Sequence, residues 1–227
     1  MVKNHLKRIK SPRTWNILRK THKFISKPNP GGHKLEQAVS INTFLKEILK
    51  VTKTTKETKY LLTHKEVKIN GNKKKDEKHQ VGFLDVVTLP DKKKYLCTIN
   101  KKGLLDAKEV KKDETLLRIT GKTILNQGRI QINSLSGINI FVDKKEGAKY
   151  KIGDTLLINA STKEVKEHFP RQKNMTGFIF TGKHAGKQGL IKEISQGEVT
   201  IKTEKDEFET HKEYVLITGK TKPVIEL

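Results

Sequence analysis

The string that most resembles enzyme chemistry lies near the C-terminus and reads Gly177-Phe178-Ile179-Phe180-Thr181-Gly182-Lys183-His184. It nearly matches the phosphate-binding loop of nucleotide hydrolases, in which a Ser or Thr must follow the lysine to bind magnesium. Here His184 takes the place of that hydroxyl residue, and the interior Phe-Ile-Phe favours a strand over a flexible loop. The string therefore argues against nucleotide hydrolysis.

Other residue types that could carry chemistry are scattered along the chain. The eight histidines, at positions 5, 22, 33, 64, 79, 168, 184 and 211, form no close pair at ligand spacing, and one cysteine cannot build a zinc knuckle. Cys97 lies in an alternating run, which favours a buried strand residue over a nucleophile. The sequence predicts no enzyme, no cofactor, no metal site and no small-molecule substrate.

Positive charge dominates the composition. The chain holds 48 Lys and Arg against 25 Asp and Glu, a net charge of +23 over 227 residues. Residues 1–34 contain ten Lys and Arg and no acid, and residues 1–75 contain 16 of the 23 excess charges. A single charged run would indicate only a solvated face. An excess of this size predicts a nucleic-acid partner, because basic residues displace counterions from phosphates.

The compartment can also be predicted. A single cysteine excludes an intramolecular disulfide and fits a reducing environment. No stretch approaches the roughly 20 apolar residues of a membrane span, and no apolar core follows the basic N-terminus as in a secretory signal. We expect a cytoplasmic protein without a membrane partner.

Residues 1–34 are interpreted as a basic arm that is interrupted by prolines and closed by Gly31-Gly32. Such an arm cannot build a core alone, so we expect it to be extended and largely disordered until it meets a polyanion. Trp15 could stack on a base or anchor the arm, and we favour the anchor. The candidate RNA-binding residues of the arm and its end are Lys3, His5, Lys7, Arg8, Lys10, Arg13, Trp15, Arg19, Lys20, Lys23, Lys27, His33 and Lys34.

The remaining chain predicts an α+β, mostly β fold. Residues 37–66 have the apolar spacing of two short helices, the second opening with a capping box at Thr54 and Glu57. Asn70-Gly71 after an alternating run predicts a tight hairpin turn. Short alternating runs over 81–170 and 174–218 predict two small β barrels or sandwiches. We divide the chain into a basic N-terminal arm (1–36), a small domain (37–94), a central β domain (95–170) and a C-terminal β domain (171–227).

A family resemblance rests on the order and spacing of several strings. These are His5-Leu6-Lys7-Arg8 followed by Trp15, then Gly32-His33-Lys34-Leu35, then Val67-Lys68-Ile69-Asn70-Gly71-Asn72 with Gly82-Phe83-Leu84-Asp85-Val86, and Thr181-Gly182-Lys183-His184-Ala185-Gly186-Lys187-Gln188-Gly189. Together they resemble the archaeal and eukaryotic small-subunit ribosomal protein of class e, member four, over essentially the whole chain.

The resemblance implies an alpha-L RNA-binding domain over 37–94 and a KOW domain with an SH3-like fold over 171–227. It implies an RNA-binding face on the first of these at Lys53, Lys56, Lys68, Asn70, Gly71, Asn72, Lys73 and Lys74, and a second one on the KOW loop at Lys183, His184 and Lys187. It implies a structural constituent of the cytoplasmic small ribosomal subunit that supports assembly and translation. Its partners would be small-subunit ribosomal RNA and neighbouring ribosomal proteins.

Two details depart from the family pattern. Gly31-Gly32 stands where Gly-Pro is usual, and the chain ends at Leu227 without the basic tail of eukaryotic members, which makes it archaeal-like. Glycines 182, 186 and 189 allow a close backbone approach, so N–H groups and two lysines there could hold phosphates. The alternatives are a plain tight barrel turn with solvated lysines and, for the alpha-L face, a solvated helix pair.

Two other classes of protein remain open on the sequence. One is a KOW-bearing transcription or translation factor that binds transiently, although such a factor would not need an acid-free arm of 34 residues. The other is an RNA-modifying enzyme with an alpha-L domain, such as a pseudouridine synthase. That class needs a catalytic domain with its own Asp motif, and the predicted barrels are too small to hold one.

Overall fold

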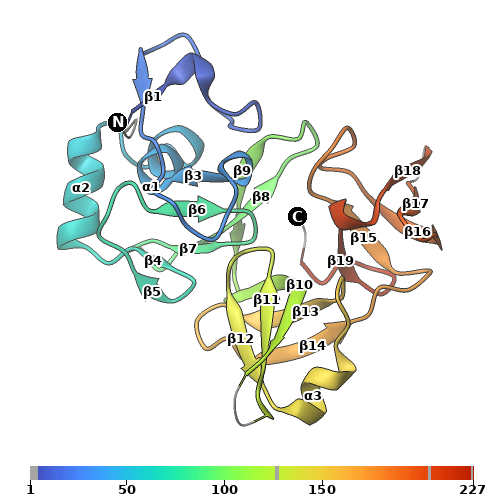
Figure 1. Cartoon of the computed structure of the whole chain (residues 1–227). Coiled ribbons are helices and arrows are strands. Elements are labelled where there is room, and N and C mark those ends of the chain that lie inside the picture. Colours follow the sequence, from blue (N-terminus) through green and yellow to red (C-terminus); the bar gives the residue numbers. More distant parts are fainter. Residues whose placement is uncertain (1–4, 126–127, 204–205, 226) are drawn as a thin grey trace. The chain divides into compact units, whose positions relative to one another are not determined.

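The computed structural model describes residues 5–125, 128–203, 206–225 and 227, and it divides into two compact units (Figure 1). The first unit comprises Met1–Thr98 and Leu104–Asp113, and the second comprises Ile99–Gly103 and Glu114–Leu227. Both units are mostly β, as the sequence predicts. Lys3 lies outside the described residues.

The first unit combines short strands with a helical segment. Its elements are β1 (Leu6–Lys7), η1 (Arg8–Lys10), β2 (Phe24–Ile25), η2 (Leu35–Gln37), β3 (Ala38–Ser40), α1 (Ile41–Thr43), η3 (Phe44–Ile48), α2 (Thr55–His64), β4 (Lys68–Ile69), β5 (Asn72–Lys73), β6 (Gln80–Gly82), β7 (Val86–Thr88), β8 (Lys94–Ile99) and β9 (Leu105–Val110).

The five-stranded sheet of the first unit has the order β5-β4-β7-β8-β9, and a separate pair joins β3 to β6. Ile69, Val87 and Leu96 of this sheet are buried, and so is Val86, which pairs with Leu96 on the other face from Val87. Because β8 and β9 complete this sheet, the first unit extends to Asp113, beyond the predicted domain boundary between residues 94 and 95.

The predicted helix pair is present, with capped beginnings. Ser40 accepts a hydrogen bond from the Thr43 backbone N–H at 3.2 Å, and α1 then passes into a π-helical turn, η3. At α2, Thr54 Oγ1 accepts from the Glu57 N–H at 3.2 Å, which confirms the predicted cap. The Glu57 carboxylate accepts from the Lys53 N–H at 2.7 Å and from the Thr54 hydroxyl at 3.0 Å, and these two bonds lower the pKa of Glu57.

The N-terminal segment, residues 5–36, is folded onto the first unit rather than extended. Strands β1 and β2 pair as a hairpin, and the Leu105 N–H donates to the Thr14 carbonyl at 2.7 Å. Trp15 is only 1% exposed, and its indole N–H donates to the Leu35 carbonyl at 3.1 Å. The prediction that Trp15 anchors the segment is confirmed. The prediction of an extended, largely disordered arm is wrong for residues 5–34, because buried side chains dock the segment.

The second unit is built of antiparallel strands and one short helix. Its elements are β10 (Glu114–Ile124), β11 (Ile130–Ser134), β12 (Asn139–Val142), α3 (Lys144–Lys149), β13 (Thr155–Asn159), β14 (Val165–Phe169), β15 (Thr176–Ile179), β16 (Gln188–Ile194), β17 (Glu198–Lys202), β18 (Glu207–His211), η5 (Lys212–Tyr214) and β19 (Val215–Gly219).

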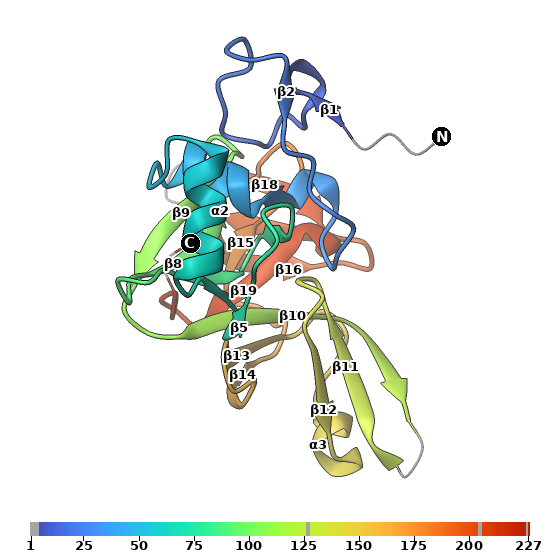
Figure 2. The same ribbon diagram turned by 90° about the vertical axis from the view of Figure 1, so that its left-hand side faces the viewer.

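Two five-stranded sheets form the second unit, with the orders β12-β11-β10-β13-β14 and β18-β17-β16-β15-β19. The long strand β10 pairs with β13 along its first half and with β11 along its second, with a register shift between Ile119 and Gly121. Figure 2 shows β11 and β12 side by side with the end of β10. Leu117, Ile132 and Leu156 lie at the core of this sheet.

Cys97 is fully buried on β8, where burial raises the pKa of its thiol, so it is the strand residue that was predicted. Among the described residues, no helix is both long enough and apolar enough to cross a bilayer.

Candidate nucleic-acid interface

A buried carboxylate, Asp85, fixes the hairpin turn between β4 and β5. Asp85 is 4% exposed and accepts hydrogen bonds from Asn70 Nδ2 at 2.7 Å, the Gly82 N–H at 2.8 Å and His33 Nε2 at 2.9 Å. Asn70 and Gly71 both have positive φ, 48° and 80°, as the favoured two-residue hairpin turn requires. The side chains that hold the turn are therefore all satisfied inside the fold.

This network changes the role of two predicted RNA-binding residues. The His33 side chain is 5% exposed and points at Asp85. The Asn70 amide donates to Asp85 and accepts from the Val86 N–H at 2.9 Å, so both of its ends are engaged. His33 and Asn70 thus position the turn, and their side chains are not free to bind a ligand.

Two lysines of the hairpin, the half-buried Lys68 and the exposed Lys73, share one acidic partner. Lys68 and Lys73 are cross-strand neighbours, and their Nζ atoms lie 3.2 and 3.4 Å from the Glu66 carboxylate. Hydrogen bonds from Lys68 and then Lys73 lower the pKa of Glu66. Exposed pairs of this kind contribute little to stability, so phosphate can take the place of Glu66. Nearby, Asn72 is exposed and both Gly71 and Lys74 are half-buried.

Lys53 and Lys56 lie at the N-terminal end of α2. Both are exposed, one just before the helix and one in its first turn. The hairpin lysines follow the C-terminus of the same helix. The lysines predicted for the first RNA-binding face thus form two groups at the two ends of α2, on one unit.

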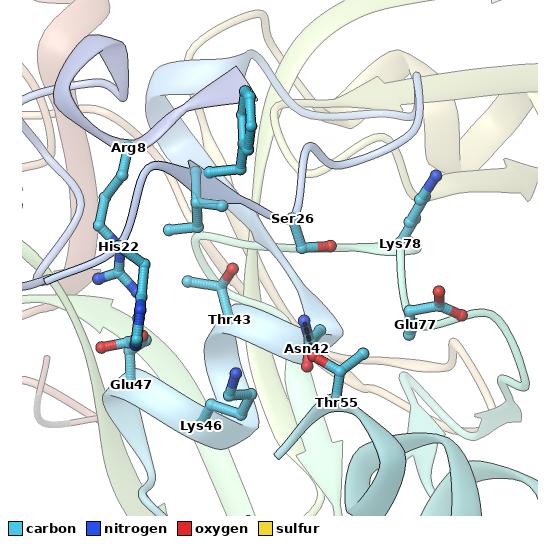
Figure 3. A pocket seen from close by; sticks show the side chains of 12 residues that line it. Arg8, His22, Ser26, Asn42, Thr43, Lys46, Glu47, Thr55, Glu77 and Lys78 are labelled. Atoms are coloured by element: carbon cyan, nitrogen blue, oxygen red, sulfur yellow. Dashed lines mark hydrogen bonds and ion pairs between the residues drawn. The ribbon is translucent and has the colours of Figure 1, made fainter. Parts of the chain in front are cut away.

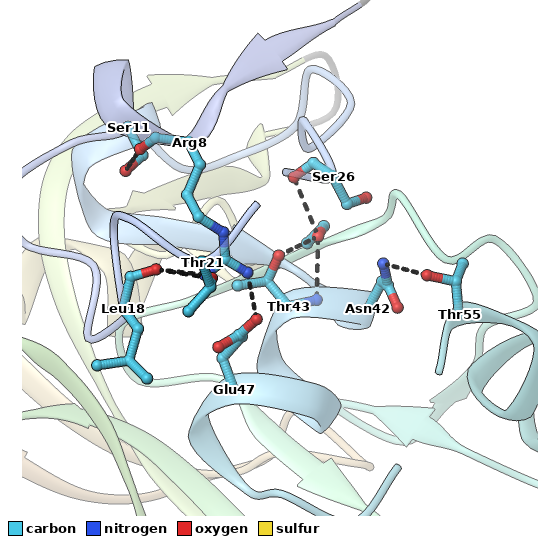
Figure 4. A network of polar contacts seen from close by, with 10 residues as sticks. Arg8, Ser11, Leu18, Thr21, Ser26, Asn42, Thr43, Glu47 and Thr55 are labelled. Carbon is cyan, nitrogen blue, oxygen red and sulfur yellow. Dashed lines mark hydrogen bonds and ion pairs between the residues drawn. The ribbon is translucent and has the colours of Figure 1, made fainter. Parts of the chain in front are cut away.

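The N-terminal segment divides into outward and inward cations. Arg8 is 4% exposed, donates from Nη1 to the Leu18 carbonyl at 2.7 Å and pairs with Glu47 (Figure 4). Arg19 donates to the backbone carbonyls of Ser11 and Pro12 at 2.8 and 2.7 Å.

Arg8 and Trp15 were predicted to contact RNA, but burial removes them from the surface. Arg19 and Lys27 are half-buried. The exposed candidates on this segment are His5, Lys7, Lys10, Arg13, Lys20, Lys23 and Lys34.

The glycines of the C-terminal loop serve the packing of the chain itself. Gly182 and Gly186 have φ of 89° and 84°, and a Cβ on Gly186 would lie 2.0 Å from the Asn100 carbonyl oxygen. A Cβ on Gly189 would lie 2.5 Å from the Lys202 carbonyl oxygen. The N–H groups of Ala185, Gly186 and Lys187 already donate to carbonyls of the chain. The expectation that the N–H groups of this loop hold phosphates is therefore wrong for these three.

The side chains of the same loop gather on an aromatic residue. The His184 ring stacks on Phe208 of β18, with centroids 4.4 Å apart and planes 15° apart. The Lys187 ammonium lies 5.1 Å from the Phe208 centroid, within cation–π range. Lys183 is exposed. Sequence reasoning missed Phe208, because it lies 24 positions after His184 in a strand rich in charged residues.

No group of three His, Cys, Asp or Glu side chains is close enough to hold a metal ion in the part of the chain that the structure describes. The arrangement offers dispersed cations on ordered backbone, which suits phosphate contacts and gives no sign of bond-breaking chemistry.

Comparison with family models gives two matches. The RS4NT (NUC023) domain matches residues 2–36, and the ribosomal family S4e matches residues 91–165. The first match covers the folded N-terminal segment. The second begins just before β8 and ends at the start of β14.

Full-length relatives agree with the family models. The small ribosomal subunit protein eS4 of Methanocaldococcus jannaschii is 34% identical and covers 99% of this chain and 98% of its own. Its counterpart from Archaeoglobus fulgidus is 34% identical and covers 100% and 99%. The crystal structure of the 30S ribosomal protein S4e from Thermoplasma acidophilum is 25% identical, with a TM-score of 0.69 over 82% of this chain and 96% of that one.

Proposed function

Because this chain belongs to the eS4 family and is therefore a structural constituent of the small ribosomal subunit, not an enzyme, we propose that it binds ribosomal RNA through three groups of basic residues at its surface. It belongs to the cytoplasmic small subunit, with ribosomal RNA and ribosomal proteins as partners. Membership of this family excludes the two rival classes, the transient KOW-bearing factor and the RNA-modifying enzyme.

The three groups have different surroundings. The first lies on the N-terminal segment, and the second comprises the α2 and hairpin lysines, in the region assigned to an alpha-L module. The third is the loop of Lys183, His184 and Lys187, in the region assigned to a KOW module. Within the second group, the hairpin lysines flank a turn held by Asp85, so their contacts are preorganised and select RNA shape. The third group should add affinity with less discrimination, as phosphate contacts do.

One observation carries the proposal. In the N-terminal segment and the hairpin, inward polar groups such as Arg8, His33 and Asn70 are paired within the fold, while most of the other cations there are exposed on ordered backbone. Residues 1–34 contain ten Lys and Arg and no acid, and the docked backbone presents the exposed ones among them as a shaped surface. A shaped cationic surface binds folded RNA at a lower entropic cost than a free arm.

Paired affinities test the different roles. Replacing Lys53, Lys68 and Lys73 together with Ala should weaken binding to a ribosomal RNA fragment more than to an unstructured RNA at the same salt. Replacing Lys183 and Lys187 should weaken both about equally. The matched control replaces Lys144, Lys145 and Lys149, which are exposed on α3, and removes the same charge elsewhere.

Melting curves check that none of the variants loses its fold. If the Lys53/Lys68/Lys73 variant lost affinity for both RNAs in equal proportion, the shape-reading role would be wrong. If the α3 control weakened binding as much, only total charge would matter.

A further inference from the structure

Charged side chains line the hollows of the first unit. A hollow of about 400 Å³ has Arg8, Lys46 and Glu47 among the residues around it (Figure 3), and a groove beside α2 has Lys56 and Lys65. Ribosomal proteins are the other partners of a small-subunit constituent, and protein interfaces are depleted of Lys, Glu and Asp at their centre. A surface without charge is therefore the better candidate for a contact with a protein neighbour.

One segment of the second unit has no charge at all. Residues 130–142, which form β11, a turn and β12, contain no Asp, Glu, Lys, Arg or His, although 32% of the chain is charged. On the face of this sheet away from the core, Phe141 pairs with Gln131, and Gln131 pairs with Thr123. Gln131 donates to Asn133 Oδ1 at 2.7 Å, and Asn133 donates to Thr123 Oγ1 at 3.2 Å. The amides thus hold one another, and Phe141 is 61% exposed beside them.

The same segment ends in an open sheet edge. Strand β12 lies on the side of β11 away from β10, and β11 is the strand with which it pairs (Figure 2). In an antiparallel pair, alternate residues direct their N–H and C=O groups away from the partner strand. Outside the ladder with β11, Asn139–Val142 makes no backbone–backbone hydrogen bond within the described residues.

The other edges of the five-stranded sheets are protected against pairing with another chain. Strands β9, β14 and β18 each carry acidic residues together with Lys or His, and β5 carries Lys73. Strand β19 is uncharged but entirely buried. Charged side chains are a common device that keeps an edge strand from pairing. Among the described edges of these sheets, β12 alone combines exposed positions with the absence of charge.

We propose that β12 receives an extended segment of a neighbouring ribosomal protein, which pairs with this edge as an added strand. A polypeptide offers N–H and C=O groups at the spacing of the open edge, and RNA does not. The incoming segment carries an apolar or aromatic side chain next to Phe141, because cross-strand neighbours of this kind stabilise each other. The inference goes beyond the proposed RNA binding, since it rests on membership of the family and on a surface that none of the three basic groups uses.

Photo-crosslinking in assembled small subunits tests the added strand. The full chain carries a benzophenone amino acid in place of Phe141 or of Asn139, the two exposed positions of β12, and the crosslinked peptides are sequenced by mass spectrometry. Both positions should attach to one segment of one ribosomal protein, at residues two apart, because side chains on one face of a strand repeat every second residue. The same probe at Glu167, an exposed position of the charged edge strand β14, should not attach to that segment.

A variant of the edge separates strand addition from mere proximity. Phe141→Lys places a charge on the edge and should lower the crosslink yield from position 139 by at least about tenfold, the loss expected at the centre of an interface. Ile152→Lys is the matched control, because Ile152 is 60% exposed in the turn before β13 and its replacement adds the same charge. It should leave the yield unchanged. Both variants should bind a ribosomal RNA fragment at least as tightly as the unaltered chain.

Several results would overturn the proposal. These are attachment to ribosomal RNA, attachment to a second copy of this chain, attachment scattered over several proteins, no attachment, or an unchanged yield with Phe141→Lys. If Phe141→Lys fails to fold by its melting curve, the spacing of the attachment sites decides alone. If the crosslinks contradict an added strand while the RNA fragment still binds, only this surface is wrong. Failure of the unaltered chain to bind the fragment would instead reject the proposed function.

Discussion

Replacing Asp85 should both destabilise the first unit and loosen the Asn70-Gly71 turn, which we propose as part of the RNA-binding surface. The Asp85 carboxylate is buried and accepts from His33, Asn70 and Gly82 at 2.7–2.9 Å. Hydrogen bonds to a charged acceptor contribute about 1.5–3 kcal/mol each. Part of that sum is offset, because Asp85→Ala also relieves the desolvation of the carboxylate. We expect a net loss of about 3–5 kcal/mol for Asp85→Ala, as for other broken buried polar pairs.

Denaturant unfolding followed by Trp15 fluorescence measures this loss, because Trp15 is the single tryptophan and is buried in the first unit. Asp91→Ala is the matched control, since Asp91 is exposed, and it should change the unfolding free energy by less than about 0.5 kcal/mol. Asp85→Asn should lose less stability than Asp85→Ala. At the same salt, it should nevertheless prefer folded RNA over unstructured RNA less than the unaltered chain does. A loss below about 1 kcal/mol for Asp85→Ala would refute the idea that this carboxylate fastens the turn.

Three further predictions follow from burial and charge. Trp15→Ala should lower the free energy of unfolding by about 3–5 kcal/mol. Amides such as that of Arg8, which donates to the Lys23 carbonyl, should be protected from hydrogen exchange, and unprotected amides over residues 6–25 would show that this segment is disordered after all. If roughly six to ten phosphates are contacted, RNA affinity should fall by about 10³–10⁵ between 50 and 200 mM salt, and Gln at Lys7, Lys10 and Arg13 should flatten the slope; an unchanged slope would exclude these side chains from phosphate contact. Cys97 should resist thiol reagents at pH 8 until the protein unfolds, because burial blocks access and raises the pKa of its thiol; rapid labelling of the native protein would contradict the buried strand.

The parts of the fold that could be predicted are those with a local signal. Alternating apolar residues predicted β8 and β13, the capping pattern predicted the start of α2, and Asn70-Gly71 predicted the hairpin turn. Strands β9, β14 and β18 were missed. Each lies at the edge of its sheet and is rich in charged residues, so pairing with a neighbour holds it rather than an apolar face.

The candidate interface could be predicted as a set of cations but not as an arrangement. Nothing local tells that Arg8 turns inward to Glu47, 39 positions away, while Lys7 stays exposed. The string that contains Asp85 supported the family resemblance, yet its role as an acceptor for His33, 52 positions away, required the folded chain. Long-range pairing decides which polar residues serve the scaffold and which remain for a ligand.

The most direct test of RNA binding through the outward cations is a cryo-EM map of small ribosomal subunits that contain this chain. Lys7, Lys10 and Arg13 on the N-terminal segment, and Lys68 and Lys73 on the hairpin, should lie within hydrogen-bond distance of ribosomal RNA phosphates. Arg8, His33 and Asn70 should keep their partners within the protein. A map in which the hairpin and the N-terminal segment face solvent, with the RNA on another surface, would contradict this account.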